Sequence, residues 1–408
     1  MLVKKLATKK LKDSLLKFID WKENFGDLSY DRMDFWSSNS GKLAKKIFYR
    51  NKLLGAPLAL WGLLLENFLP KIQKLYGKPS RQVIGDAHFT LSFLEMYKHT
   101  KEKKYLKEAE RLINCMLKYS CNNYSGICWG YSFDWETTNG LFKKDTPLIT
   151  ITPYAFWAFK EHFLITKSKK SKENLLSIAK FALKDLKEKK LKNGTYSSSY
   201  STADSSSIIN ASSYRAAVLI EAYNLNNNIE YLDSANRCID FVLSFQGRRG
   251  EWFYEAKGPS DNMIDNFHTC FILRNLYICY RINKNQKILN AIKKGYDYYK
   301  DNLFYENGRP KHFSKPKYLK MRKYEMYDYA EGIKLGVLLN KDIPGSLEKS
   351  IFLANDLITN FQTKKGYFIT RVTSLGTKHR VPYLRWPQAQ LFYSLSLLLN
   401  LLNEDYIE

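Results

Sequence analysis

The stretch DNFHTCFILRNLY, residues 265–277, shows a pattern that recurs through the whole chain. A small or polar lead is followed by a dense apolar stretch with helical spacing, and an aromatic residue or leucine stands near the end. Five further segments share this pattern, namely GDAHFTLSFLEMY (85–97), ITPYAFWAFKEHF (151–163), ASSYRAAVLIEAY (211–223), YDYAEGIKLGVLL (327–339) and RWPQAQLFYSLSL (385–397). Successive copies lie roughly 60 residues apart, as expected for a repeated pair of helices. Each copy is apolar almost all round, which predicts a helix that is enclosed on every side.

More amphipathic segments that carry Lys and Glu lie between these copies. We expect helices there at roughly 52–75, 102–119, 172–190, 229–246, 285–300 and 345–361. Six enclosed and six amphipathic helices in alternation can close into a double-layered ring. A linear solenoid would need polar terminal caps, whereas the last copy is as apolar as the middle ones. The sequence therefore predicts an all-α fold, an (α/α)6 toroid, over residues 51–408, with residues 1–50 as an N-terminal helical extension.

The connections between the predicted helices are unequal in length. Links that lead from an amphipathic to an enclosed helix run to about 15–25 residues, and loops this long in a compact domain are usually functional. Most of them contain a Gly followed by alternating aromatic and polar residues, which predicts short β-hairpins. All of these loops lead into N-terminal ends of enclosed helices, so we expect them at one mouth of the ring, where the helix dipoles favour anions.

The 408 residues carry a net charge of +25, from 65 Lys and Arg against 40 Asp and Glu. A field of this sign favours an anionic partner such as nucleic acid, an anionic membrane surface or an acidic sugar polymer. The lysines are spread over the outer helices without a stripe of stacking aromatic residues, so nucleic acid is not expected. AT-rich coding sequence would produce the same excess of Lys, which leaves an anionic sugar or polysaccharide as a hypothesis that needs other support.

Other sequence features limit cofactors and location. The six cysteines form no C-x-x-C pair, which argues against structural zinc and a disulfide framework. No Gly-rich phosphate loop occurs, so we expect no organic cofactor, and no metal site is expected either. The N-terminus lacks the apolar core of a signal peptide, and the longest apolar stretch, residues 56–65, is well short of the roughly 20 residues of a membrane span. We expect a soluble, cytoplasmic protein without stable membrane insertion, and a homodimer remains open.

Aromatic and charged residues gather in the loops and first helical turns at the expected mouth. Flat aromatic faces beside directional polar groups suit sugar rings, and arginines can hold a carboxylate or phosphate. The expected substrate-binding residues are Asp86, Tyr131, Trp135, Trp252, Asp265, Asp328, Arg380, Arg385 and Trp386. Packing in the core is the competing interpretation for each aromatic residue.

Two histidines stand at the same position of the repeated pattern, in its first and fourth copies. His88 follows Asp86 and His268 follows Asp265, and a six-fold ring would place the two copies opposite each other. A histidine held by a carboxylate is a general acid or base near neutral pH, although capping of a helix start explains the same pattern. The other catalytic candidates are Tyr254, Tyr324 and Asp134.

These residues fit three kinds of function. A site of tyrosine, histidine and arginine suits proton removal beside a uronate carboxylate, the chemistry of C5-epimerases and β-eliminating lyases, and we favour this one. A glycoside hydrolase would need two facing carboxylates, for which the candidates are Asp134, Asp265, Glu325 and Asp328. A non-catalytic glycan-binding scaffold protein would need the aromatic residues but no acid and base.

The segments DNFHTCFILRNLY and PYLRWPQAQLFYSLSLLL resemble those of a bacterial α/α-toroid family found among capsule and O-antigen polysaccharide biosynthesis proteins. The resemblance covers residues 80–400. More distantly, Arg385 and Trp386 at the start of the last enclosed helix resemble the C-terminal domain of glucuronyl C5-epimerases. The resemblance implies an enzyme of surface polysaccharide biosynthesis whose site is lined by Asp265, Asn266, His268, Arg385 and Trp386.

Overall fold

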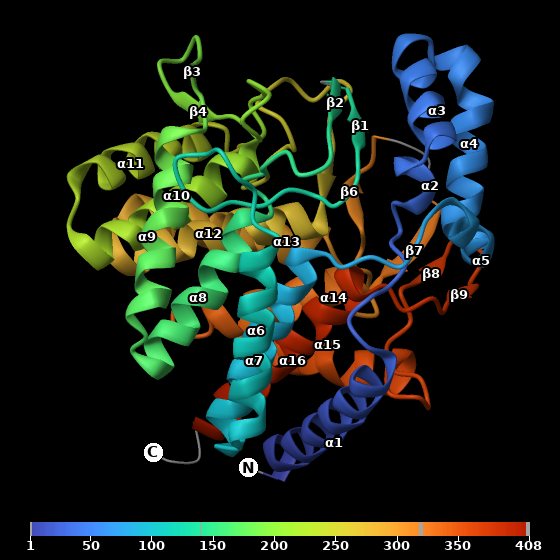
Figure 1. The fold of residues 1–408 in the computed structure, drawn as a ribbon, viewed down its shortest axis with the longest axis vertical. Coiled ribbons are helices and arrows are strands. Elements are labelled where there is room, and N and C mark those ends of the chain that lie inside the picture. Colours follow the sequence, from blue (N-terminus) through green and yellow to red (C-terminus); the bar gives the residue numbers. More distant parts are fainter. Residues whose placement is uncertain (1, 139, 318–320, 405–408) are drawn as a thin grey trace.

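The computed structural model describes residues 2–138, 140–317 and 321–404. Within these residues, two concentric layers of helices form an (α/α)6 toroid, which confirms the predicted fold class (Figure 1). The inner layer consists of α6 (Val83–Thr100), α8 (Thr152–Thr166), α10 (Ile209–Asn226), α12 (Asn266–Asn283), α14 (Met326–Leu339) and α16 (Ala389–Glu404). The outer layer includes α7 (Lys103–Lys118), α9 (Lys169–Lys184), α11 (Ile229–Ser244), α13 (Gln286–Asn302) and α15 (Ser346–Phe361).

The short turns from inner to outer helices share one backbone conformation in four of the described pairs. The residue that ends the inner helix is left-handed, with φ between 55° and 60°, and its amide N–H bonds to the carbonyl four residues earlier; these residues are Lys101, Lys167, Asn227 and Lys284. The outer helix begins two residues later. Ser168, Asn228 and Asn285 then accept a backbone N–H at its first turn, which satisfies one of the free donors there. The connections at this end of the ring are therefore short.

The remaining outer position is filled by α1 (Leu2–Phe25), which packs against α15 and α16. Its Phe18 is fully buried, with its ring centroid 5.0 Å from that of Phe392 in α16 and 6.5 Å from that of Phe89 in α6. Residues 1–50 were expected to lie outside the ring as an extension. The helix of residues 2–25 instead completes the outer layer, because the apolar face of α16 would otherwise face water. The division of the chain into domains at residue 50 stays a prediction, and the last four residues of the expected toroid domain lie outside the described residues.

Residues 34–76 leave the ring as a separate group of helices. These are α2 (Asp34–Ser37), α3 (Asn39–Arg50), α4 (Lys52–Phe68), α5 (Pro70–Gln73) and η1 (Lys74–Tyr76). The segment expected as an outer helix at 52–75 is therefore helical, but it does not lie in the outer layer. Its main helix, α4, pairs with α3 rather than with α6. Gly55 allows this pairing, because a Cβ there would come within 2.2 Å of Phe48 Cα. The α3–α4 hairpin rises beside the mouth of the ring (Figure 1).

Short antiparallel strands lie in the long loops, as predicted. They are β1 (Trp135–Thr137) with β2 (Gly140–Phe142), β3 (Glu188–Lys190) with β4 (Tyr196–Ser198), β5 (Ile264–Asp265) with β6 (Phe313–Lys315), and β7 (Arg322–Glu325) with β8 (Arg371–Thr373) and β9 (Lys378–His379). The pairs β5–β6 and β7–β8 join neighbouring loops instead of forming hairpins within one loop. This pairing ties the loops into a continuous rim.

The place of α1 in the ring predicts a large effect of one core substitution. Phe18→Ala should lower the free energy of unfolding by about 3–5 kcal/mol, because it leaves a cavity between α1, α6 and α16. Leu16→Ala on the same helix is the control; Leu16 is 43% exposed, and its loss should cost within about 0.5 kcal/mol. Urea denaturation followed by circular dichroism measures both. Equal, small effects of the two substitutions would mean that α1 is a dispensable extension.

Candidate functional site

The loops and the first turns of inner helices enclose a cavity of about 350 Å³. Its wall is mainly aromatic and cationic, and includes Arg32, Tyr131, Trp135, Tyr154, Tyr200, Asn210, Tyr254, Asp265, Phe267, His268, Phe271, His312, Phe313, Arg322, Tyr327, Arg385 and Trp386. A second chamber of about 220 Å³ adjoins it and shares Trp135, Tyr200 and Tyr254. The two chambers have the size and the mixed aromatic and polar lining of a small-molecule site.

His268 lies at the start of α12, where Asp265 holds it twice. One carboxylate oxygen of Asp265 accepts the backbone N–H of His268 at 2.9 Å, and the other lies 2.6 Å from Nδ1. A carboxylate is an acceptor, so Nδ1 carries the proton and the Nε2 lone pair is left for the cavity. The ring of Tyr254 lies 4.7 Å from the imidazole, and burial raises the pKa of the Tyr254 phenol. This phenol therefore stays protonated at neutral pH.

A second histidine of the cavity wall, His312, is held in the same tautomer, but its Nε2 already has a partner. Its Nδ1 lies 2.7 Å from Asp328 and its Nε2 is 3.3 Å from a guanidinium nitrogen of Arg322. Arginine can only donate, so Nε2 accepts and Nδ1 donates to Asp328. Burial, with Arg322 beside it, lowers the pKa of His312 to about 3. His312 is thus neutral at physiological pH and fixes the position of Arg322.

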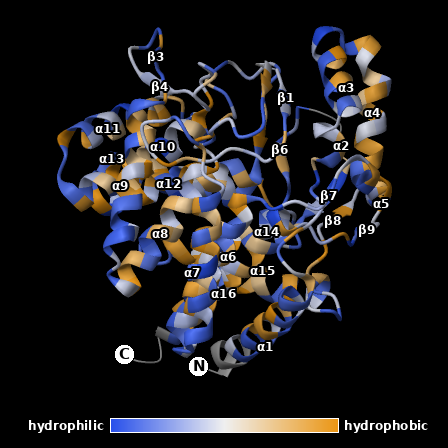
Figure 2. Ribbon diagram, in the orientation of Figure 1, coloured by the Kyte–Doolittle hydropathy of each residue, from blue (hydrophilic) through white to orange (hydrophobic). Residues whose placement is uncertain are grey.

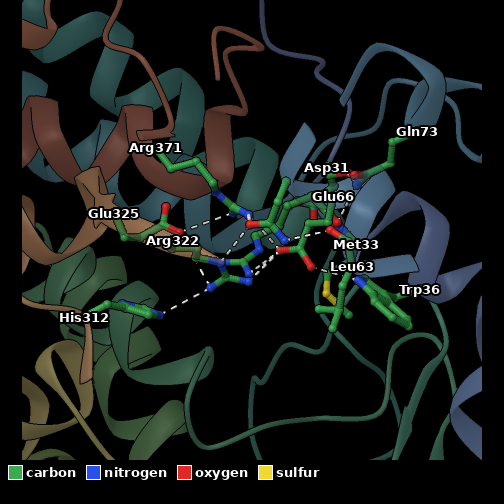
Figure 3. A network of polar contacts seen from close by, with 12 residues as sticks. Asp31, Met33, Trp36, Leu63, Glu66, Gln73, His312, Arg322, Glu325 and Arg371 are labelled. Carbon is green, nitrogen blue, oxygen red and sulfur yellow. Dashed lines mark hydrogen bonds and ion pairs between the residues drawn. The ribbon is translucent and has the colours of Figure 1, made fainter. Parts of the chain in front are cut away.

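Glu66 of α4 reaches the same region and joins the α3–α4 hairpin to the rim (Figure 3). It is buried and accepts from Arg32 at 2.6 Å, from Arg322 at 2.9 Å and from Arg371 at 3.1 Å. Its other oxygen accepts the indole N–H of Trp36 at 3.0 Å. Burial alone would raise the pKa of Glu66, but the three arginines hold it well below its ordinary value. Arginines of three separate segments therefore share one buried carboxylate behind the cavity, and two of them, Arg32 and Arg322, line the cavity itself.

Arg385 and Trp386 form another part of the wall. Arg385 donates two bonds of 2.6 Å to Asp31, and its guanidinium lies 5.2 Å from the ring centroid of Tyr131. Trp386 stacks on Tyr327 with ring centroids 3.7 Å apart. The guanidinium of Arg385 is thus already paired, and Tyr327 covers one face of the indole.

Three buried polar atoms of the wall have no hydrogen-bond partner among the described residues. They are the donors Arg32 Nε and Trp386 Nε1 and the acceptor Asn210 Oδ1. Buried polar groups are almost always satisfied, so three unpartnered atoms on residues of one cavity wall are unusual. Within the described part of the chain, no three His, Cys, Asp or Glu side chains are grouped closely enough to hold a metal ion.

The structure brings together seven of the residues expected at the site. These are Tyr131, Trp135, Tyr254, Asp265, His268, Arg385 and Trp386, all of which line the cavity. Their roles in catalysis and binding stay predictions. The sequence analysis missed Arg32, Arg322 and His312, which come from loops outside the repeated pattern. No local signal marked them, because their partners are far away in the chain.

Three expected site residues belong to the core instead. His88 is fully buried, and its Nδ1 bonds to the carbonyl of Ile84 at 2.7 Å. Burial, together with Lys334 nearby, lowers the pKa of His88 well below its usual value, so it is neutral. Trp252 is buried and donates its indole N–H to the carbonyl of Val242 at 2.9 Å. Asn266 donates to the carbonyl of Leu303 at 3.1 Å and thereby fixes the following loop.

Five other expected residues also lie outside the cavity wall, each for a separate reason. Asp86 is bound by Arg81, with both oxygens 3.0 Å from one nitrogen, and Asp134 forms an ion pair of 2.8 Å with Lys42 of α3. The ring of Tyr324 lies beneath the guanidinium of Arg309, with 5.3 Å from that group to the ring centroid. Asp328 is buried behind His312, and Arg380 is exposed beyond β9. The structure thus places these five residues outside the cavity wall, and direct contact of any of them with a substrate stays a prediction.

The sequence matches no protein-family model and no curated protein sequence. Solved structures do resemble the fold. A cellobiose 2-epimerase from Bacillus thermoamylovorans matches with a TM-score of 0.62 at 10% identity over 79% of this chain and 88% of that chain. A GH76 α-mannanase from Bacteroides thetaiotaomicron matches with a TM-score of 0.59 at 13% identity, over 81% and 88% of the two chains. A polysaccharide lyase matches with a TM-score of 0.54 at 10% identity, over 79% and 90%. The α/α toroid of this chain is thus one that sugar epimerases, glycoside hydrolases and lyases share.

Proposed function

We propose that this protein is a carbohydrate-active enzyme that removes a proton from an acidic sugar, as a uronosyl C5-epimerase or lyase does. The observation that carries the proposal is the pairing of His268 with Asp265 in a cavity that also holds arginines. A base with a free lone pair stands there beside groups that stabilise negative charge.

His268 is the proposed base. Asp265 holds Nδ1–H, so Nε2 takes the proton from C5, and the carboxylate then stabilises the imidazolium that forms. The electron pair of the broken C–H bond moves into the substrate carboxylate as an enediolate. Return of a proton to the opposite face gives the epimer, whereas expulsion of the oxygen at C4 gives an unsaturated uronate. Tyr254 has a protonated phenol beside His268 and is the proposed acid for either outcome.

Arg32 is the proposed contact for the substrate carboxylate. Its terminal nitrogen bonds to Glu66, but its buried Nε has no partner among the described residues. The nitrogens of Arg322 already donate to Glu66, His312 and Asn67. Arg322 therefore contributes its positive charge to the site rather than a free hydrogen-bond donor. A positive field at the place where the enediolate forms lowers the barrier to its formation.

A glycoside hydrolase with a carboxylate pair is less well supported. Such an enzyme needs two carboxyl groups that face each other across the sugar. In the described part of the chain, Asp265 is the one acidic residue that lines the larger chamber, and it is committed to His268; Glu136, Glu255 and Asp261 line the smaller chamber. Glu325 and Asp328, which the sequence offered as partners, are fully buried behind the wall.

A second candidate is epimerisation or isomerisation of a neutral reducing sugar by the same base. Arg385 and Arg32 already pair with Asp31 and Glu66, which reduces the need for an anionic substrate. The proton would then come from the carbon beside a carbonyl group.

The resemblance of the segments at 265–277 and in the last inner helix further supports a role in surface polysaccharide synthesis in the cytoplasm, as part of the same proposal.

Incubation in deuterated water separates these reactions. With uronate-containing glycans, we expect deuterium at C5 by NMR or a new ultraviolet absorbance from an unsaturated uronate. With reducing sugars, deuterium at C2 would select the second candidate.

His268→Gln should lower turnover by about 10²–10⁴-fold, because general base catalysis is lost. His99→Gln, at the far end of α6, is the control. Proton exchange that persists in His268→Gln would refute the assignment of the base.

Substitution of Arg32 tests the charge of the substrate. Arg32→Gln should raise KM for a uronate substrate by about 10-fold or more, because a hydrogen bond to a charged group is lost. The KM for a neutral analogue should change little. Arg380→Gln is the matched control, since Arg380 is exposed and outside the cavity. Equal effects of Arg32→Gln on both substrates, with an unchanged unfolding temperature, would argue against carboxylate recognition.

A further inference from the structure

The first half of α4 presents apolar side chains to solvent. Leu53 is 87% exposed, Leu54 is 71% exposed and Trp61 is 47% exposed. Leu58 and Leu60, between them, are also exposed. In Figure 2 the ribbon of α4, at the outer edge of the molecule, carries many residues in the orange of high hydropathy. Single exposed leucines are ordinary, but a contiguous group of this kind marks a surface that binds something.

The charge around this surface is strongly one-sided. Residues 34–76 contain seven Lys and Arg against two acidic residues, Asp34 and Glu66. Both acidic side chains are buried, Glu66 among arginines, and so add little negative charge to the surface. Three of the cations, Lys46, Arg50 and Lys52, are exposed at the end of the hairpin where the leucines lie. The hairpin therefore combines an apolar surface with a basic border.

We propose that the α3–α4 hairpin is a docking surface for a lipid bilayer that contains anionic lipids. Leu53, Leu54 and Trp61 would enter the interface, and the cations would bind the anionic headgroups. A second copy of this chain fits the surface less well, because a symmetric contact would bring the two basic borders together. No single described helix is long and apolar enough to cross a membrane; α4 together with residues 70–76 passes that test only as a pair bent by 108°. Binding in the interface is consistent with this geometry.

The hairpin is fixed to the rim of the ring. Lys42 forms an ion pair with Asp134 at 2.8 Å, and Lys45 donates to the carbonyl of Glu136 at 3.1 Å. Lys45 and Tyr49 of α3 also line the smaller chamber of the site. A bilayer bound to the hairpin would therefore lie beside the cavity.

Vesicle flotation tests the proposal on the full chain. We expect the protein to float with vesicles of phosphatidylcholine and phosphatidylglycerol in equal parts, and to bind much less to vesicles of phosphatidylcholine alone. Leu53→Gln with Leu54→Gln should weaken binding by at least about 10-fold, because two side chains no longer gain from insertion. Leu375→Gln is the control, since Leu375 is 79% exposed on the turn between β8 and β9, outside the α3–α4 hairpin.

A second set of variants tests the charge. Lys46→Gln, Arg50→Gln and Lys52→Gln together should weaken binding on the order of 100-fold, from about 5-fold for each cation. Lys169→Gln, Lys170→Gln and Lys172→Gln on α9 remove the same charge from the opposite side of the molecule and should have little effect (Figure 1). Failure to float with the mixed vesicles, or binding that survives either hairpin variant, would overturn the proposal. A dimer in analytical ultracentrifugation that Leu53→Gln with Leu54→Gln dissociates would also overturn it in favour of self-association.

Discussion

The enclosure of the inner helices is the constraint on which the rest of the structure depends. A helix that is apolar on every side must be covered on every side, so each inner helix needs two inner neighbours and an outer layer. For α16 that outer cover is α1, which the chain supplies from its other end. Because α1 takes this position, the segment between it and α6 is released from the ring. That segment then carries Asp31, Arg32 and Glu66 to the mouth.

Buried charge holds this segment in place. Glu66 and the arginines that bond to it are removed from water, which costs several kcal/mol for each ion, and only a complete set of partners offsets that cost. Asp31 and Arg385 are also buried charges that offset each other, with 2.6 Å between the carboxylate oxygen and the guanidinium nitrogen. An incomplete set would leave a buried charge without a partner, so the hairpin has one well-defined position relative to the rim. The same arginines give the cavity wall its positive charge.

The predictability of each feature follows from how local its physical cause is. The inner helices were predictable because burial acts on every turn of them. The pair of Asp265 and His268 was visible too, since a helix start places residues i and i+3 in contact. The chain from Asp328 through His312 to Arg322 was not visible, because it joins loops that meet only after folding. The burial of Trp252 was not predictable for a related reason, because a position in a long loop does not reveal which way the indole points.

The arrangement of the loops explains why the fold alone leaves the chemistry open. The long loops meet at the N-terminal ends of the inner helices, while the repeated short turns lie at the opposite end. A substitution at the mouth therefore leaves the packing between the two helical layers intact. Sugar epimerases, a mannanase and a lyase accordingly share this toroid with the present chain at 10–13% identity. In this chain the segment from Asp31 to Glu66 supplies part of the cavity wall and also bears the exposed apolar surface of α4. Arg32 lines the cavity and also bonds to Glu66, so a single side chain joins the cavity wall to the hairpin.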